Sequence, residues 1–343
     1  MRTTFTIVAD LRPQVQDYWD RGLLGLELDP GFPARPYVYV LYALDKNPAD
    51  PASLIPTWGD ECPSPPDGMG AGCTILGRVS RLDASAPWPV QATEVVLIED
   101  FPQQFPSHSV GGLRFGADGA LYVSVGEGAS FTVVDYGQLG GASGAGPGQN
   151  VPINPFGDPP VPTGGLQAVP GAQGGALRSQ SVRRPAGQPV TLSGALLRID
   201  PDTGDAMPDN PLFGSPDPKA RRIVAYGLRN PFRFAMRPGS TEVWLGDVGW
   251  NDAEEINLVD VAGGSAANFG WPCYEGVGPQ SAYQAAGLTS CLTLQLEGSA
   301  RPPFFGYRHA DQVVPGENCA TGTSSVSGLA FYTYGNYPAT YQG

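Results

Sequence analysis

Charged side chains are scarce in this sequence, and lysine is nearly absent, since only Lys46 and Lys219 occur among 343 residues. Charged residues make up 15% of the chain, whereas a typical soluble domain has about 25%. The 20 basic and 33 acidic residues leave a net charge of −13. Nucleic acids and anionic membranes both favour a basic face. The composition therefore makes both of them poor partners for this chain.

Long apolar runs are also missing. No segment approaches the roughly 20 apolar residues of a membrane-spanning helix, and the first ten residues lack the apolar core of a signal peptide. The length is nevertheless sufficient for one large domain with its own core, and 41% of the residues are hydrophobic. We therefore expect a folded chain with no membrane span.

Helical periodicity is rare, while glycine (47) and proline (36) are abundant. The best helix candidate, residues 11–19, contains Pro13 and is followed by Gly22, so it predicts one or two turns at most. No comparable helix is expected elsewhere. Short runs rich in β-branched and aromatic residues, each bounded by turn residues, predict antiparallel strands. These runs are residues 37–42, 74–82, 94–98, 120–125, 195–199, 223–226 and 242–245.

One hairpin pattern repeats along the chain. Residues 115–126 are echoed by residues 236–247, and a looser copy runs from residue 28 to residue 40. In each copy a turn of Pro, Asp or Gly leads into an alternating aromatic strand. Repeated hairpins separated by variable loops favour a single β-propeller domain over residues 1–343, and a β-sandwich is the structural alternative. Residues 136–191 include a Gly-, Ala-, Pro- and Gln-rich stretch and are predicted to form a long insertion loop.

The five cysteines fall as two nearby pairs and one single residue. Cys62 and Cys73, and Cys273 and Cys291, predict two local disulfides, which leaves Cys319 without an evident partner. Disulfides favour an oxidising compartment. The alternative, five buried thiols, fits poorly with proline-rich loops such as residues 61–66.

Three clusters could carry chemistry, and each also has a purely structural interpretation. His108, one of two histidines, precedes the clearest hairpin and could act as a general base. Arg229 lies in the Tyr-Gly-Leu-Arg-Asn-Pro stretch of residues 226–231, where it could stabilise an oxyanion or simply bind loop carbonyls. Residues 246–257 combine glycines with carboxylates, as a calcium site or a solvated acidic turn would. No Gly-x-Ser-x-Gly motif is present to indicate a serine hydrolase.

Taken together in their order, these motifs resemble the soluble glucose/sorbosone dehydrogenase family, six-bladed β-propellers that use pyrroloquinoline quinone. The stretches that carry the resemblance are residues 22–26, 29–32, 37–40, 108–126, 194–199, 208–211, 226–231, 249–257 and 268–272. The Asn-Phe-Gly-Trp-Pro sequence of residues 268–272 is among the closest matches. The resemblance implies an all-β, six-bladed β-propeller. Since the first family strands and the last blade lack counterparts, we expect the propeller to be incomplete at both ends.

The resemblance also implies a chemistry, namely oxidation of a sugar or related alcohol with hydride transfer to the quinone. His108 would be the base, Arg229 would stabilise negative charge on a quinone oxygen, and Asn230 would contact the cofactor. An external electron acceptor would be required. Calcium ligands are implied at the main-chain oxygens of Gly249 and Trp250, with a second ion near Glu254, Glu255 and the carbonyl of Phe269.

Three departures from the family pattern bear on this hypothesis. Ser107 stands where the glucose enzymes have an acid, Asp20 where they have a glutamine, and no lysine occurs near residues 331–336. The missing lysine and Ser107 favour an alternative, a non-catalytic propeller that binds carbohydrate or protein. The joint presence of His108, Arg229 and the calcium-type loop opposes it. The implied location is secreted or periplasmic.

Overall fold

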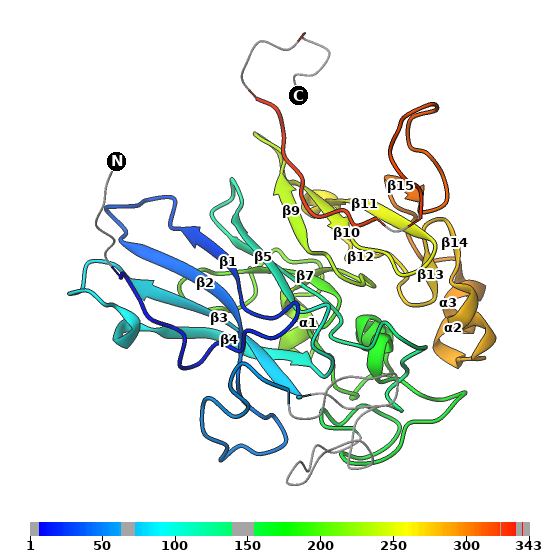
Figure 1. The fold of residues 1–343 in the computed structure, drawn as a ribbon, viewed down its shortest axis with the longest axis horizontal. Helices are drawn as coiled ribbons and strands as arrows, with labels where there is room; N and C mark the ends of the chain where they lie inside the picture. Colours follow the sequence, from blue (N-terminus) through cyan, green and yellow to red (C-terminus); the bar gives the residue numbers. More distant parts are fainter. Residues whose placement is uncertain (1–6, 63–72, 139–153, 323, 334–337, 339–343) are drawn as a thin grey trace.

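The main elements of the protein are three antiparallel sheets (Figure 1). A computed structural model describes residues 7–62, 73–138, 154–322, 324–333 and 338. The first sheet contains β1 (Leu23–Leu28), β2 (Tyr37–Leu44), β3 (Ile75–Asp83) and β4 (Val95–Gln103). The second contains β5 (Val110–Phe115), β6 (Leu121–Val125), β7 (Ala195–Ile199) and β8 (Ile223–Tyr226), to which the short β12 (Ala267–Asn268) adds in parallel. The third contains β9 (Arg233–Met236), β10 (Glu242–Asp247), β11 (Ala253–Asp260) and β15 (Phe305–Arg308).

All seven runs predicted as strands are strands, and each repeated hairpin forms the first two strands of one sheet. These hairpins are β1–β2, β5–β6 and β9–β10. β1 contacts β5 and β5 contacts β9, so the first strands of the three sheets lie next to one another (Figure 1). This is the radial arrangement of propeller blades. The described residues form three such sheets, and the number of six blades stays a prediction.

The middle sheet explains why its strands are apolar throughout. Successive side chains of a strand point to opposite faces, and in β6 Leu121, Val123 and Val125 join the core shared with the first sheet. Tyr122, between them, joins the core shared with the third sheet. Both faces are therefore buried, which the continuous run of apolar residues in β6 and β7 reflects.

Short helical elements supplement the sheets. They are 3-10 helices η1 (Gln91–Thr93), η2 (Gly175–Arg183) and η3 (Val261–Gly263), and α-helices α1 (Pro218–Arg222), α2 (Ser281–Ala285) and α3 (Thr289–Glu297), beside a small hairpin of β13 (Tyr274–Glu275) and β14 (Gly278–Pro279). None of the helices in the described ranges is long and apolar enough to span a membrane. Residues 11–19 form turns and one isolated bridge rather than a helix.

The nine-residue helix α3 was not expected from the sequence. Its apolar pattern is short, but Cys291 and Leu294 are buried together with Leu288 in a cluster that also holds Tyr283. Cys291 is bonded to Cys273, as predicted, and Cys62 is bonded to Cys73. Cys319 is an exposed free cysteine. Tertiary packing and a disulfide therefore stabilise a helix whose own sequence signal is weak.

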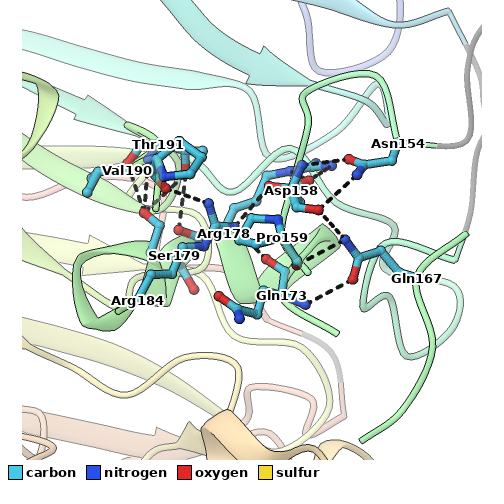
Figure 2. Close-up of polar contacts among 12 residues, drawn as sticks. Asn154, Asp158, Pro159, Gln167, Gln173, Arg178, Ser179, Arg184, Val190 and Thr191 are labelled. Carbon is cyan, nitrogen blue, oxygen red and sulfur yellow. Dashed lines mark hydrogen bonds and ion pairs between the residues drawn. The ribbon is translucent and has the colours of Figure 1, made fainter. Parts of the chain in front are cut away.

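The stretch predicted as an insertion loop contains no strand in its described part, residues 136–138 and 154–191; residues 139–153 lie outside the description. It does contain η2, most of which is buried. Figure 2 shows Arg178 of η2 facing Asp158, to which its Nε donates at 2.8 Å, while Arg184 donates to the other Asp158 oxygen at 2.9 Å. Arg178 also donates to Gln104, which follows β4, at 3.1 Å. These bonds join the stretch firmly to the sheets.

The core shared by the first two sheets can be tested at Leu113 in β5, which is 1% exposed. We expect Leu113→Ala to lower the free energy of unfolding by about 2–5 kcal/mol, since it removes apolar contacts and leaves a cavity between the sheets. The control is Leu296→Ala on α3, where the side chain is 88% exposed and the expected change is within about 0.5 kcal/mol. Chemical denaturation measures both. Equal losses in the two variants would contradict the assignment of this core.

Candidate active site

The β5–β6 hairpin places His108 opposite Glu127. Val110 pairs with Val125, and continuing this register two residues toward the open end of the hairpin brings His108 and Glu127 together. His108 Nδ1 lies 2.8 Å from Glu127 Oε1. Between the strand and Glu127 stands Gly126, where a Cβ would collide with the His108 carbonyl. The sequence did not single out Glu127, because the register shifts between Val110 and Leu113, and regular alternation from the turn would not place Glu127 opposite His108.

Both members of this pair are buried, His108 to 4% exposure and Glu127 to 1%. Glu127 also accepts a hydrogen bond from the indole Nε1 of Trp271. Burial raises the pKa of Glu127 to about 8, against the lowering effect of the Arg229 charge and the Trp271 bond. Burial and the Arg229 charge hold the pKa of His108 well below its ordinary value. Above about pH 8 Glu127 is therefore a carboxylate that accepts the Nδ1 proton, which leaves the lone pair on Nε2.

Trp271 is held in place by η2. Ser179 Oγ and Gln180 Nε2 each donate to the Trp271 carbonyl at 2.8 Å. Gln180 also exchanges two amide hydrogen bonds of 2.9 Å with Asn268. The Asn-Phe-Gly-Trp-Pro motif thus positions an indole against the carboxylate that orients His108.

Arg229 is buried at the junction between β8 and β9. Its backbone N–H donates to the Asp247 carboxylate at 3.0 Å, and its Nη1 donates to the carbonyls of Val248 and Gly249 at 2.8 and 2.5 Å. The backbone of Asn230 donates to Asp247 at 2.7 Å. Burial lowers the pKa of Arg229 from its ordinary value. Within the described part of the chain, its Nε has no hydrogen-bond partner.

One cavity of about 490 Å³ brings five of the predicted residues together. They are His108, Arg229, Asn230, Gly249 and Trp250. Because Nδ1 of His108 is bonded to Glu127, Nε2 is the ring nitrogen left for a molecule in this cavity. A neutral imidazole and a buried guanidinium then share one wall, which allows proton removal beside a stabilised negative charge.

Glu254, Glu255 and Phe269 do not line this cavity. Glu254 binds His309, the N–H of Gly249 and the N–H of Val326. Glu255, its neighbour in β11, accepts from Asn257 and Gly276. Adjacent residues of a strand point to opposite faces, so these two carboxylates are directed apart.

The residues predicted to bind calcium offer few side-chain ligands in one place. Among the described residues no group of three or more His, Cys, Asp or Glu side chains could hold a metal ion. The Gly249 carbonyl accepts a hydrogen bond from Arg229. Side chains of the described residues therefore do not form a calcium cage by themselves. The calcium positions at main-chain oxygens stay a prediction from the resemblance.

Two of the departures from the family pattern contact each other. The Ser107 hydroxyl donates to the Asp20 carboxylate, and both residues line the cavity. The third departure is also visible in the structure, because both lysines form ion pairs elsewhere, Lys46 with Glu99 and Lys219 with Asp100. Among the described residues, the charged donors at this cavity are Arg21 and Arg229, beside the histidines His108 and His309.

Comparison with known proteins agrees with this fold. The soluble aldose sugar dehydrogenase of Escherichia coli, solved in its apo form, superposes with a TM-score of 0.52 at 20% identity, covering 96% of this chain and 67% of that one. The chain thus shares the fold of the β-propeller sugar dehydrogenases.

Sequence comparison finds similarity to the same group of proteins. Residues 175–340 match the family described as Glucose / Sorbosone dehydrogenase. Aldose sugar dehydrogenase YliI of Escherichia coli (strain K12) is 28% identical over 158 residues, which are 46% of this chain and 36% of that protein. The HIPL1 protein of Arabidopsis thaliana is 24% identical over 344 residues, covering 94% of this chain and 42% of that protein. Residues 175–340 are therefore similar to the Glucose / Sorbosone dehydrogenase family, and part of the chain is similar to YliI, which confirms the resemblance of the motifs.

The raised pKa of Glu127 predicts a pH dependence of stability. Its folded pKa of about 8 exceeds the ordinary value of 4.5, so between these values the unfolded chain releases a proton that the folded chain retains. The free energy of unfolding should fall as the pH rises from about 5 to about 8, by up to about 1.4 kcal/mol per pH unit for this group. Glu127→Gln should make the fall shallower, as denaturation midpoints across this range would show.

The control for this experiment is Glu297→Gln on α3, whose side chain is 49% exposed. It should leave the pH dependence unchanged. A Glu127→Gln slope equal to that of the wild type would contradict the buried, proton-retaining state of Glu127.

Proposed function

We propose that this protein oxidises a sugar or a related alcohol with hydride transfer to pyrroloquinoline quinone. The observation that carries the proposal is that His108, held by Glu127, and Arg229 line one cavity. The family match and the homology to an aldose sugar dehydrogenase support an oxidoreductase. The matched segments span only part of those relatives, so the activity of the whole protein is part of this proposal.

The cavity suits a flat, anionic cofactor in several respects. Trp250 and Phe131 supply aromatic walls, and the Trp250 indole N–H donates to the Phe131 carbonyl at 2.6 Å, which fixes the two relative to each other. Arg229 supplies positive charge and an unpartnered Nε. Arg229 and Asn230 are the residues that would hold the quinone, which when bound would supply the hydride acceptor.

The residues of the chain would divide the remaining work as follows. Nε2 of His108 would accept the proton of the substrate hydroxyl, while the carbon-bound hydrogen leaves as hydride with two electrons. Glu127 holds the imidazole by Nδ1 and keeps the lone pair on Nε2. Arg229 places a fixed positive charge at the cavity wall, where it stabilises developing negative charge. Turnover would require an external electron acceptor, for which a redox dye can substitute.

The alternative, a non-catalytic propeller that binds carbohydrate or protein, has less support. It gives no reason for a buried imidazole, held by a carboxylate behind it, to line the cavity beside an arginine. The two disulfides agree with an oxidising compartment. We therefore include a secreted or periplasmic location in the proposal.

The direct test is His108→Gln in a dye-reduction assay with added quinone, calcium and an aldose panel. Because a positioned base contributes about 10²- to 10⁴-fold, we expect the rate to fall by that factor while quinone binding, followed by absorbance, persists. Unchanged sugar-dependent reduction in His108→Gln would contradict the role of this residue. Failure of the folded protein to bind quinone would instead favour the non-catalytic alternative.

The pH profile of the same assay tests Glu127. Nε2 of His108 can accept a proton only after the His108–Glu127 pair has lost the proton that it shares. The kcat/KM should therefore rise with pH and level off near the Glu127 pKa of about 8. Glu127→Gln should flatten this rise, because the glutamine side-chain amide does not titrate. A wild-type rate that falls between about pH 6 and about pH 8 would contradict this assignment.

A further inference from the structure

Backbone strain marks a second residue at the same cavity. Among the described residues, two that are not glycine have positive φ angles, His108 at 52° and Trp19 at 54°. This left-handed region is costly for a bulky side chain, and residues held there cluster at functional sites. Both of these residues line the cavity. The fold therefore retains strain at two positions of one site, and the proposed reaction uses only one of them.

Trp19 is tied to the base through neighbouring residues. The N–H of Asp20 donates to the Pro106 carbonyl at 3.3 Å, and the Asp20 carboxylate accepts the Ser107 hydroxyl. The segments that carry Trp19 and His108 are thus joined side by side. Their relative position does not depend on the flexible side chain of either residue.

The indole itself is half open. Phe105 contacts it nearly edge-on, with ring centroids 5.9 Å apart, and Phe131 lies at 6.3 Å. Phe131 in turn lies 5.9 Å from the His108 ring. The Trp19 side chain nevertheless remains 52% exposed. A packed aromatic support with an uncovered surface beside a base is suited to a ligand with one apolar face and a polar edge.

We propose that Trp19 is a substrate-binding residue whose indole stacks on the C–H face of a sugar ring, so that a ring hydroxyl is directed toward Nε2 of His108. This inference rests on the proposed function. It assigns preference to a cyclic sugar over an open-chain polyol with the same number of carbons, because only the ring presents a rigid apolar face. Asp20 lies at the same cavity wall as a carboxylate able to accept hydrogen bonds from hydroxyl groups.

The test compares Trp19→Ala, Trp19→Phe and the control Trp88→Ala. Trp88 has the same 52% exposure but does not line this cavity. Calorimetric titration with D-glucose and with sorbitol measures binding without any cofactor. Dye reduction with added quinone and calcium separates KM from kcat. Thermal unfolding verifies that each variant is folded.

We expect Trp19→Ala to raise the dissociation constant and the KM for glucose about tenfold. The kcat should change less than about twofold, because the stacking contact is lost from the ground state and the transition state alike. Sorbitol binding should remain weak in all variants. Trp19→Phe should retain most of the glucose affinity, and Trp88→Ala should match the wild type.

Two results would overturn the inference. The first is that a folded Trp19→Ala variant binds and oxidises glucose as the wild type does. The second is that the wild type shows no preference for the cyclic sugar, because it either binds no glucose or binds sorbitol as tightly as glucose. A third outcome separates the two proposals. If neither the wild type nor any variant reduces the dye, while Trp19→Ala alone loses glucose binding, the stacking role of Trp19 stands and the proposed oxidation fails. The two proposals are therefore distinguishable.

Discussion

The site depends on one buried carboxylate. Glu127 binds Nδ1 of His108 with one oxygen and the indole of Trp271 with the other, and it does so almost entirely away from water. A buried carboxylate is costly unless its oxygens are satisfied. The surrounding structure meets this need from two directions, from the β5–β6 hairpin that carries His108 and from the segment after β12 that carries Trp271.

This constraint explains why so much polar structure surrounds a β-sheet core. η2 is buried through Arg178, Ser179 and Gln180, and two of these residues bind the Trp271 carbonyl. Arg178 donates to Asp158 within the same stretch (Figure 2). Arg178 also donates to Gln104, which joins the stretch to the segment after β4. Satisfied polar networks of this kind fix one arrangement of side chains. A stretch without strands thereby determines the position of an indole, a carboxylate and finally an imidazole.

The sequence was informative wherever a local pattern decides the structure. Strands, hairpins and both disulfides followed from periodicity, turn residues and cysteine spacing, and the motifs placed His108, Arg229 and Asn230 in one site. Glu127 was missed because its role arises from cross-strand register rather than from its own neighbours. α3 was missed because tertiary packing and the bond between Cys273 and Cys291 stabilise it. Trp19 has no sequence signal, since strain is visible only in the backbone.

The protonation state of the His108 ring tests the account most directly. The chain has only two histidines, so nitrogen-15 NMR of labelled protein, compared with a His309 variant, would assign the His108 signals without ambiguity. The account predicts a ring that is still neutral at the ordinary histidine pKa of about 6.5, with the proton on Nδ1 and the lone pair on Nε2 above the Glu127 pKa of about 8. A ring that becomes imidazolium at an ordinary histidine pKa, or that carries its proton on Nε2 above about pH 8, would contradict it.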